Sequence, residues 1–432
     1  MQRKIFIVFL LFLGSLLFSE PLKVGEVTYN IEGNSREYFL ENFLKLRVAE
    51  PFETEEDLEI YLKDKKQDLI NLRLYDSVEI FHRINSDHTV DIDVNLDDTW
   101  NLIPIAVPLY NSNEGFKVSY KIYYSNVLGT LMNSKIEGKY NWYPGDNITD
   151  SLFNINEPRN WYSTFTLSDI RIGSTTWSVS TGIDYSTEES ANENNPDELD
   201  IKFSYYSVDA AIGTSFDLPG RFSWGPSISI TRNFNYDIEK DVNDSVKGNN
   251  SLDFGFDHSL NYNKVNWMGN FKEGYSFALG NAYAISSDAD DVDINLTTSA
   301  RYYKPWKFLG YSTSFETFYT FGHPKYSVGD KVRGVADNRM TGNQGLFLQN
   351  NLAIKLIEPR GWELQAIPFI DMGIAWEDDK TIEKNDFKMG AGTEFVIYPG
   401  FTKSFLFRLS GGISLLDSTI DPEIDMTASL SF

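Results

Sequence analysis

The sequence predicts a mainly β protein, in which a sixteen-stranded antiparallel transmembrane β-barrel follows one small N-terminal β-α-α-β-β domain. Three observations lead to this prediction. Period-two segments run from residue 98 to the end, long and short connectors alternate between them, and 15% of the residues are aromatic. Beyond residue 20 no apolar run reaches the length of a membrane-spanning helix. Membrane strands alternate apolar and polar residues, so averages of hydropathy conceal them.

The composition excludes several other classes of protein. The chain has 432 residues with no Cys, and 38 basic against 62 acidic side chains. A disulfide framework, a Cys-ligated metal site and a basic nucleic-acid binder are therefore excluded. The four His have no partner at i+4, and neither a nucleophile elbow nor a dinucleotide loop is found. We expect a protein that is not an enzyme, has no catalytic residues, and binds no metal, cofactor or nucleic acid.

Residues 1–20 are predicted to be a signal peptide. Arg3 and Lys4 precede an apolar run at 5–18, and Ser19 and Glu20 follow it. Basic, apolar and small or polar regions in this order are typical of secretory signals, and the run is too short to span a membrane as a helix. The mature chain is expected in the periplasm or beyond.

Residues 21–97 predict a small α/β domain that begins with a strand and two helices. Asn34 with Glu37 predicts the cap of the first helix, and Thr54 with Asp57 predicts the cap of the second.

Two strands complete the domain, and apolar and acidic residues alternate in the last of them, 90–96. Asp91 and Asp93 are expected to discourage uncontrolled edge pairing while leaving the backbone available, and whether 27–31 or 78–84 forms the open edge is left undecided.

This domain resembles a POTRA (polypeptide-transport-associated) domain. The segments that carry the resemblance are "VGEVTYNIEGN", "EPFETEEDL" and "NLRLYDSVEI". The resemblance implies a periplasmic domain that offers a sheet edge to other chains, since an unpaired edge can accept an extended segment through main-chain hydrogen bonds. The alternative is a simple spacer.

Residues 98–432 predict the barrel. A soluble sandwich could show the same alternation, and the connectors decide between the two. Those predicted after odd-numbered strands are long and acidic, such as "STEESANENNPDELD" and "EDDKTIEKND", whereas "RIGS", "DLPGR" and "EPR" follow even-numbered strands. Outer-membrane barrels have short periplasmic turns and longer external loops. The sixteen predicted strands are 99–110, 115–127, 131–142, 152–168, 175–186, 200–216, 223–237, 251–264, 270–285, 292–303, 307–321, 345–357, 361–377, 386–398, 404–415 and 423–432.

Three motifs in the barrel carry a second resemblance. "VRG" at 332–334 follows strand eleven, "FIDMG" at 369–373 lies on strand thirteen, and "NEPRNW", which includes Glu157 to Trp161, is placed on strand four. In this order they resemble the BamA/TamA family of outer-membrane assembly barrels, in the surface-antigen superfamily. The chain is similar to a member with a single POTRA domain.

The resemblance implies a latch, in which a loop folds into the barrel and contacts its wall. The predicted latch residues are Val332, Arg333, Gly334, Phe369, Asp371, Gly373 and Glu394. Period two places Asp371 on the inner face of strand thirteen, where a lone carboxylate needs a partner. Strand twelve lacks the carboxylate of the family pattern, because it reads Asn351 to Lys355 without one, and Glu394 on strand fourteen is the candidate substitute.

The chain ends in a pattern typical of a barrel-insertion signal. Met426, Ala428, Leu430 and Phe432 alternate, and we expect them to point outward into lipid.

These features predict a bacterial outer-membrane assembly factor. The domain at 21–97 is expected to receive unfolded outer-membrane or secreted polypeptides, which the barrel inserts or translocates at the seam between its first and last strands. Further expected partners are outer-membrane lipid and periplasmic or inner-membrane accessory proteins. The alternatives are a secretion pore dedicated to one partner protein and a passive porin.

Overall fold

The computed structural model describes residues 20–111, 115–142, 160–192, 195–242, 251–287, 292–321, 326–336, 339–378, 380–416 and 422–430. The chain divides into two compact units. The first contains the residues up to Trp100 together with Leu128–Leu131, and the second contains Asn101–Val127 and the chain from Met132 onward. The signal peptide predicted at 1–20 lies outside the described residues except for Glu20. Among the described residues, no helix is long and apolar enough to cross a membrane.

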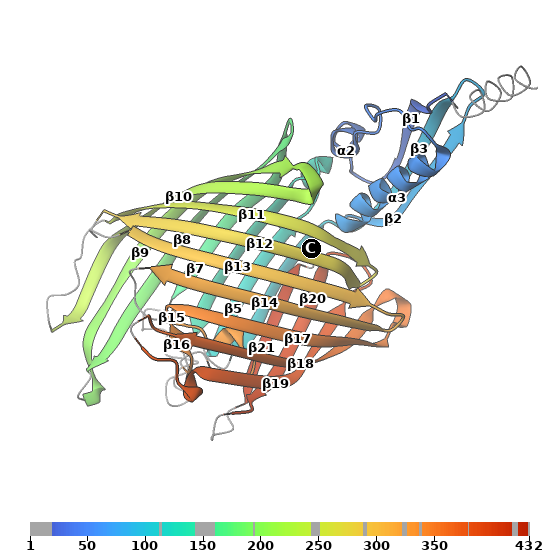
Figure 1. Cartoon of the computed structure of the whole chain (residues 1–432). Coiled ribbons are helices and arrows are strands. Elements are labelled where there is room, and N and C mark those ends of the chain that lie inside the picture. Colours follow the sequence, from blue (N-terminus) through green and yellow to red (C-terminus); the bar gives the residue numbers. More distant parts are fainter. Residues whose placement is uncertain are drawn as a thin grey trace, which may run out of the picture. The chain divides into compact units, whose positions relative to one another are not determined.

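The first unit has the predicted β-α-α-β-β order. Its elements are β1 (Lys23–Glu32), α2 (Glu37–Leu44), α3 (Glu55–Asn71), β2 (Tyr75–Ile84) and β3 (Thr89–Asp98) (Figure 1). The two helices bury leucines against the sheet, including Leu40, Leu58 and Leu69, which are fully buried with Val90 and Val94 of β3. This apolar layer holds the unit together.

One of the two helix caps is as predicted. The Thr54 hydroxyl oxygen accepts a hydrogen bond from the Asp57 backbone N–H at 3.1 Å. The cap predicted at Asn34 is wrong, since α2 begins after Arg36 without a side-chain cap. The backbone N–H of Asn34 instead donates to the Asp98 carboxylate at 2.7 Å. A partner 64 residues away cannot be read from local spacing.

The expectation that Asp91 and Asp93 limit pairing at an open edge is wrong. The sheet order is β1-β3-β2, so the last strand lies in the middle, parallel to β1 and antiparallel to β2. The open edges belong to β1 and β2. Asp91 therefore lies on the central strand and not on an edge strand. Its carboxylate accepts a hydrogen bond from Arg83 of β2 at 2.8 Å.

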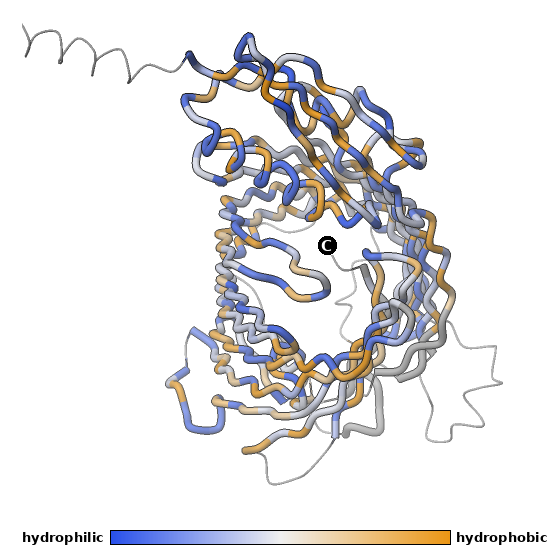
Figure 2. Tube along the Cα trace, turned by 90° about the vertical axis from the view of Figure 1, so that its right-hand side faces the viewer, coloured by the Kyte–Doolittle hydropathy of each residue, from blue (hydrophilic) through white to orange (hydrophobic). Residues whose placement is uncertain are grey.

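The second unit is a closed antiparallel barrel. Figure 2 shows its wall with hydropathy alternating along the strands. Within the described residues it has sixteen strands, in agreement with the prediction. They are β4 (Leu102–Asn111), β5 (Gly115–Tyr124), β6 (Asn133–Trp142), β7 (Trp161–Ile172), β8 (Thr175–Asn192), β9 (Asn195–Leu218), β10 (Phe222–Asp241), β11 (Leu252–Met268), β12 (Phe271–Ser286), β13 (Val292–Pro305), β14 (Leu309–Phe321), β17 (Gln344–Ile357), β18 (Glu363–Trp376), β19 (Phe387–Tyr398), β20 (Phe405–Ser414) and β21 (Glu423–Leu430).

Large apolar side chains cover the outer face of the barrel. They are exposed at alternate positions of successive strands, for example Ile228 and Ile230 on β10 and Phe254 and Phe256 on β11. An exposed apolar belt of this kind matches the hydrocarbon of a bilayer, whereas a soluble sandwich would bury it. The polar positions between them point inward.

One predicted loop in the barrel is wrong. The acidic segment 186–200 was expected to be a loop, yet β8 and β9 pair through most of it, from Ser186–Tyr205 to Ser190–Ile201. Stacked rings of Phe203, Tyr205 and Tyr236, with centroids 5.2 to 6.0 Å apart, support this extension. Main-chain pairing tolerates polar side chains in water, so acidic composition alone does not end a strand.

For strand four the structure gives β7 from Trp161 to Ile172, and residues 152–159 of the predicted strand lie outside the described residues. Glu157, Pro158 and Arg159 of the predicted motif lie outside the described residues.

Candidate functional site

Strand β18 presents the predicted acidic position to the barrel interior. Phe369 and Asp371 are buried, Gly373 shares their inward face, and Ile370 between them is exposed on the outer face. Side chains of a strand alternate between its two faces, so this arrangement follows from the sequence "FIDMG" alone. The predicted inward direction of this motif is confirmed.

The loop between β14 and β17 supplies the opposing residues. It contains a two-stranded ladder of β15 (Tyr326–Ser327) and β16 (Thr341–Gly342), and the short helix η3 (Gly329–Lys331). Val332 and Val335 on either side of the tip are fully buried, in a cluster with Phe347 and Ala375 of the barrel wall. Burial of each valine contributes about 1.5 to 3 kcal/mol, which anchors the tip on the inner wall.

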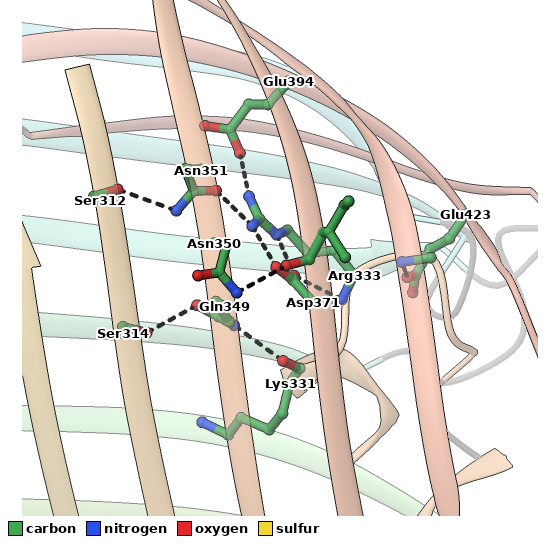
Figure 3. Close-up of polar contacts among 12 residues, drawn as sticks. Ser312, Ser314, Lys331, Arg333, Gln349, Asn350, Asn351, Asp371, Glu394 and Glu423 are labelled. Atoms are coloured by element: carbon green, nitrogen blue, oxygen red, sulfur yellow. Dashed lines mark hydrogen bonds and ion pairs between the residues drawn. The ribbon is translucent and has the colours of Figure 1, made fainter.

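Arg333 at the tip binds Asp371 in a bidentate manner (Figure 3). Its Nε lies 2.7 Å from Asp371 Oδ2, and its Nη2 lies 2.8 Å from Oδ1. The Arg333 backbone N–H also donates to Oδ2, at 3.3 Å. The Asp371 side chain is 0% exposed and that of Arg333 is 22% exposed. The guanidinium carbon lies 3.9 Å from the centroid of the Phe369 ring. The structure thus brings the predicted Arg333, Phe369 and Asp371 together.

Glu394 of β19 also faces this cluster. Its carboxylate lies 3.5 Å from Arg333 Nη1 and 3.0 Å from Arg408 Nε, and its side chain is 6% exposed. Arg408 lies on the inward face of β20 and was missed by the sequence reasoning. Its inward parity, between the exposed Phe407 and Leu409, was the available signal.

Strand β17, the predicted strand twelve, lacks the carboxylate of the family pattern, and its Asn351 amide contacts Arg333 instead. Asn351 of β17 accepts a hydrogen bond from Arg333 Nη2 at 2.6 Å and donates to Ser312 of β14 at 3.2 Å. Gln349, two residues earlier on the same face, donates to the Lys331 carbonyl at 3.0 Å. The sequence analysis named Asn351 only as the first residue of the segment that lacks the family carboxylate. Its role as the acceptor of a hydrogen bond from Arg333 was not predicted.

Glycines let the loop backbone approach the wall. A Cβ at Gly390 of β19 would lie 2.0 Å from the Arg333 carbonyl oxygen, and one at Gly373 would lie 2.9 Å from Val332. Gly334 has φ 88°, a conformation that suits glycine, and a Cβ there would lie 2.6 Å from the Ile413 backbone nitrogen. The tip is therefore fitted to a wall of small residues.

The tip has one more partner, which the sequence reasoning also missed. The Gly334 backbone N–H donates to Glu423 Oε2 of β21 at 2.8 Å (Figure 3). Glu423 is the first residue of the last strand. Together these contacts join the loop to five strands, β14 through Asn351 and β17, β18, β19 and β21 directly.

The arrangement of charges is suited to holding a loop in place. A guanidinium fork that meets both oxygens of a buried carboxylate is a strong and directional contact.

In the described part of the chain, three potential metal ligands, Glu55, Glu59 and His82, lie within 4.8 Å of one another in the first unit. The sequence reasoning looked only for His pairs on one helix, so it did not foresee this group.

The predicted C-terminal signal is only partly described. Met426 is exposed on the outer face, as predicted. Ala428 and Leu430 belong to β21, but their side chains lie outside the described residues, as does all of Phe432.

The seam between the first and last strands is weakly paired. In the described residues β21 meets β4 at a single position, Asp425 opposite Asn111. On its other side β21 pairs with β20 from Glu423–Gly412 to Leu430–Phe405. The ring therefore closes at its least paired interface.

Comparison with known proteins finds one family model that matches part of the chain and several solved structures with a similar fold. The family model of haemolysin secretion/activation proteins ShlB/FhaC/HecB matches residues 220–395. No curated protein matches the chain in sequence. Among solved structures, CdiB from Acinetobacter baumannii is similar with a TM-score of 0.66 and 14% identity over 95% of this chain and 74% of that one.

Two further structures share the fold. CdiB from Escherichia coli has a TM-score of 0.62 and 13% identity over 94% of this chain and 76% of its own. BamA from Haemophilus ducreyi lacking POTRA domains 1–3 has a TM-score of 0.51 and 15% identity over 96% of this chain and 85% of its own. The family model covers less than half of the chain, and the solved structures show that this chain shares their fold; both agree with the resemblance stated from the sequence.

Proposed function

We propose that this chain is an outer-membrane factor that inserts polypeptides into the membrane by pairing them at the seam between β4 and β21. In the described residues these two strands form a single pair, Asp425 with Asn111, and this observation carries the proposal. Elsewhere in the barrel neighbouring strands pair over most of their length, as β11 and β12 do from Asp253–Ser286 to Met268–Phe271.

The energetics of a bilayer favour such a role for this seam. Each unsatisfied backbone polar group in hydrocarbon costs several kcal/mol, so unpaired edges in lipid bind any strand that can pair with them. An incoming strand would satisfy its own backbone groups and those of β4 or β21. The free energy of pairing then drives insertion without a nucleotide or an enzymatic step.

The POTRA-like unit supplies a place to receive clients. Both β1 and β2 are edge strands, and β-strand addition gives affinity through main-chain hydrogen bonds without demanding one sequence. We infer that the unit lies in the periplasm and that unfolded outer-membrane polypeptides bind one of these edges before they reach the barrel. Accessory proteins of the periplasm or inner membrane are further candidates for the same edges.

A second candidate function is a secretion pore dedicated to one partner protein. The match of 220–395 to a family model of haemolysin secretion/activation proteins favours it, and the two CdiB structures share the fold. In this function the client passes through the lumen and the seam stays closed. The two functions therefore differ in which part of the barrel handles the polypeptide.

Depletion of the protein followed by quantitative outer-membrane proteomics tests the proposal. An assembly factor is expected to lower the amounts of many barrel proteins at once, whereas a dedicated exporter lowers one extracellular protein. A control depletion of an unrelated porin accounts for general envelope stress. An unchanged barrel profile contradicts the assembly role.

A further inference from the structure

Two neighbouring residues of the loop tip hold different strands of the barrel. Arg333 binds Asp371 of β18, and the backbone N–H of the next residue, Gly334, binds Glu423 of β21. The loop tip therefore connects β18 to β21, the last strand of the barrel.

The contact with β21 is built into the packing of the tip. A Cβ at Gly412 of β20 would lie 3.1 Å from Gly334 Cα, and Gly412 is the residue paired with Glu423. The backbone of the tip thus lies directly on β20, at the level where Glu423 reaches it. A hydrogen bond from a backbone N–H to a carboxylate is charge-assisted and stronger than one between neutral groups.

The contact between Gly334 and Glu423 lies close to the seam between β4 and β21. Glu423 lies two residues from Asp425, the one residue of β21 that pairs with β4 in the described chain. Two residues of an extended strand span about 7 Å. Glu423 and Asp425 are both on the inward-facing side of β21, and they alternate with the exposed Ile424 and Met426. The loop therefore holds the last strand beside the one pair that closes the seam in the described residues.

We propose that Glu423 is a positioning residue that couples the loop to the seam. While the loop is seated, its bond to Glu423 holds β21 against β4. When the loop leaves the wall, this bond to β21 is lost, and the seam opens. This inference rests on the proposed use of the seam and names the residue that regulates it.

Distances between spin labels across the seam test the coupling. The chain has no Cys, so Val118→Cys and Met426→Cys give two labels without further substitution. Both side chains are exposed on the outer face, on β5 and β21, and β4 lies between these strands. Pulsed electron resonance in proteoliposomes, with no client present, reports the short distances of a closed seam and the longer distances of an open one.

Glu423→Ala is expected to raise the population at long distance about tenfold, as expected from loss of a hydrogen bond to a charged group. Ser429→Ala, on the inward-facing side of the same strand, is the matched control and should leave the distribution unchanged. If the alanine variant fails to insert, Glu423→Gln retains an oxygen acceptor and should raise the open population about threefold.

Equal distributions in the parent and in the variant that inserts, alanine or glutamine, would overturn the coupling. An open seam in the parent with its loop seated would overturn it as well. The labels report on the seam without any client, so the outcome is separate from the depletion experiment. A seam that opens in Glu423→Ala while depletion leaves the barrel profile unchanged would uphold the coupling and reject the assembly function.

Discussion

The guanidinium of Arg333 meets both carboxylate oxygens of Asp371, at 2.7 and 2.8 Å, although 38 residues separate them in the sequence. We expect Arg333→Ala and Asp371→Ala each to cost about 3 to 5 kcal/mol of unfolding free energy, because the first leaves the buried Asp371 carboxylate unpaired and the second removes the bidentate partner of Arg333. Urea unfolding of the barrel in liposomes measures this loss.

A double-mutant cycle separates this contact from general damage. The double variant should be little worse than either single variant, since both remove the same interaction. Arg301→Ala is the matched control, because its ion pair with Glu316 is more exposed and should be worth about 0 to 1 kcal/mol. Additive losses at Arg333 and Asp371 would contradict a latch.

Glu394 should contribute less to the unfolding free energy of the barrel than Asp371 does. Its carboxylate lies between Arg333 and Arg408, and the Arg408 side chain is itself 42% exposed, so water can replace part of the interaction. We expect Glu394→Gln to lower the unfolding free energy by about 1 kcal/mol, close to the net value of one hydrogen bond. The same urea unfolding measures it, and a loss equal to that of Asp371→Ala would show that the two carboxylates have equal roles.

Gly390 should tolerate no side chain. A Cβ there would lie 2.0 Å from the Arg333 carbonyl oxygen, whereas a Cβ at Gly411 on the next strand would meet nothing within 4 Å. Gly390→Ala is therefore expected to expel the loop tip and to destabilise the barrel by about 1 to 3 kcal/mol or more, and Gly411→Ala should be nearly neutral.

Proteolysis at the loop provides the readout for Gly390. Cleavage within the loop should become faster in Gly390→Ala and stay at the parent rate in Gly411→Ala. Equal cleavage rates in the two variants would show that the tip does not lie on β19.

Asp91 gives the POTRA-like unit a dependence on acid. Its hydrogen bond from Arg83, with smaller contributions from Asn85 and the Glu26 backbone, lowers the pKa of the Asp91 carboxyl to about 2. A carboxyl with a depressed folded pKa contributes stability above its ordinary pKa near 3.8, and this contribution is lost as the pH falls toward 2.

Arg83→Gln should move the pKa of Asp91 back toward its ordinary value. Carbon-13 NMR of labelled aspartate in the full chain, assigned with Asp91→Asn, measures it. Arg47→Gln, which removes a pair with Glu37 in the same unit, is the control and should leave it unchanged. An unaltered titration of Asp91 in Arg83→Gln would mean that the ion pair does not set the pKa.

Local periodicity predicted the parts of the site that depend on a single strand. The inward positions of Phe369 and Asp371, and that of Glu394, follow from alternation alone, because the exposed Ile370 and Phe395 fix the opposite face. The number of barrel strands followed for the same reason.

Long-range contacts were not predictable in this way. The parallel pairing of β1 with β3 brings together residues over 60 positions apart, and it decides which strands are edges. Glu423 carries no motif, and only the folded loop reveals its partner. Likewise, the extension of β8 and β9 depends on pairing with each other, which acidic composition does not reveal.

Locking the seam tests the central claim most directly. Residues opposite each other in an antiparallel pair have Cα atoms at distances that a disulfide can bridge, so Asn111→Cys with Asp425→Cys should form one under oxidation. Ala278→Cys with Ser299→Cys, at a pair between β12 and β13 far along the ring, is the control lock.

The measurement is the rate at which each protein, reconstituted in liposomes, inserts an unfolded barrel client before and after addition of a reductant. We expect the oxidised seam lock to stop insertion and the reductant to restore it, while the control lock inserts at the parent rate in both states. Equal insertion by the oxidised and reduced forms of the seam lock would contradict insertion through the seam.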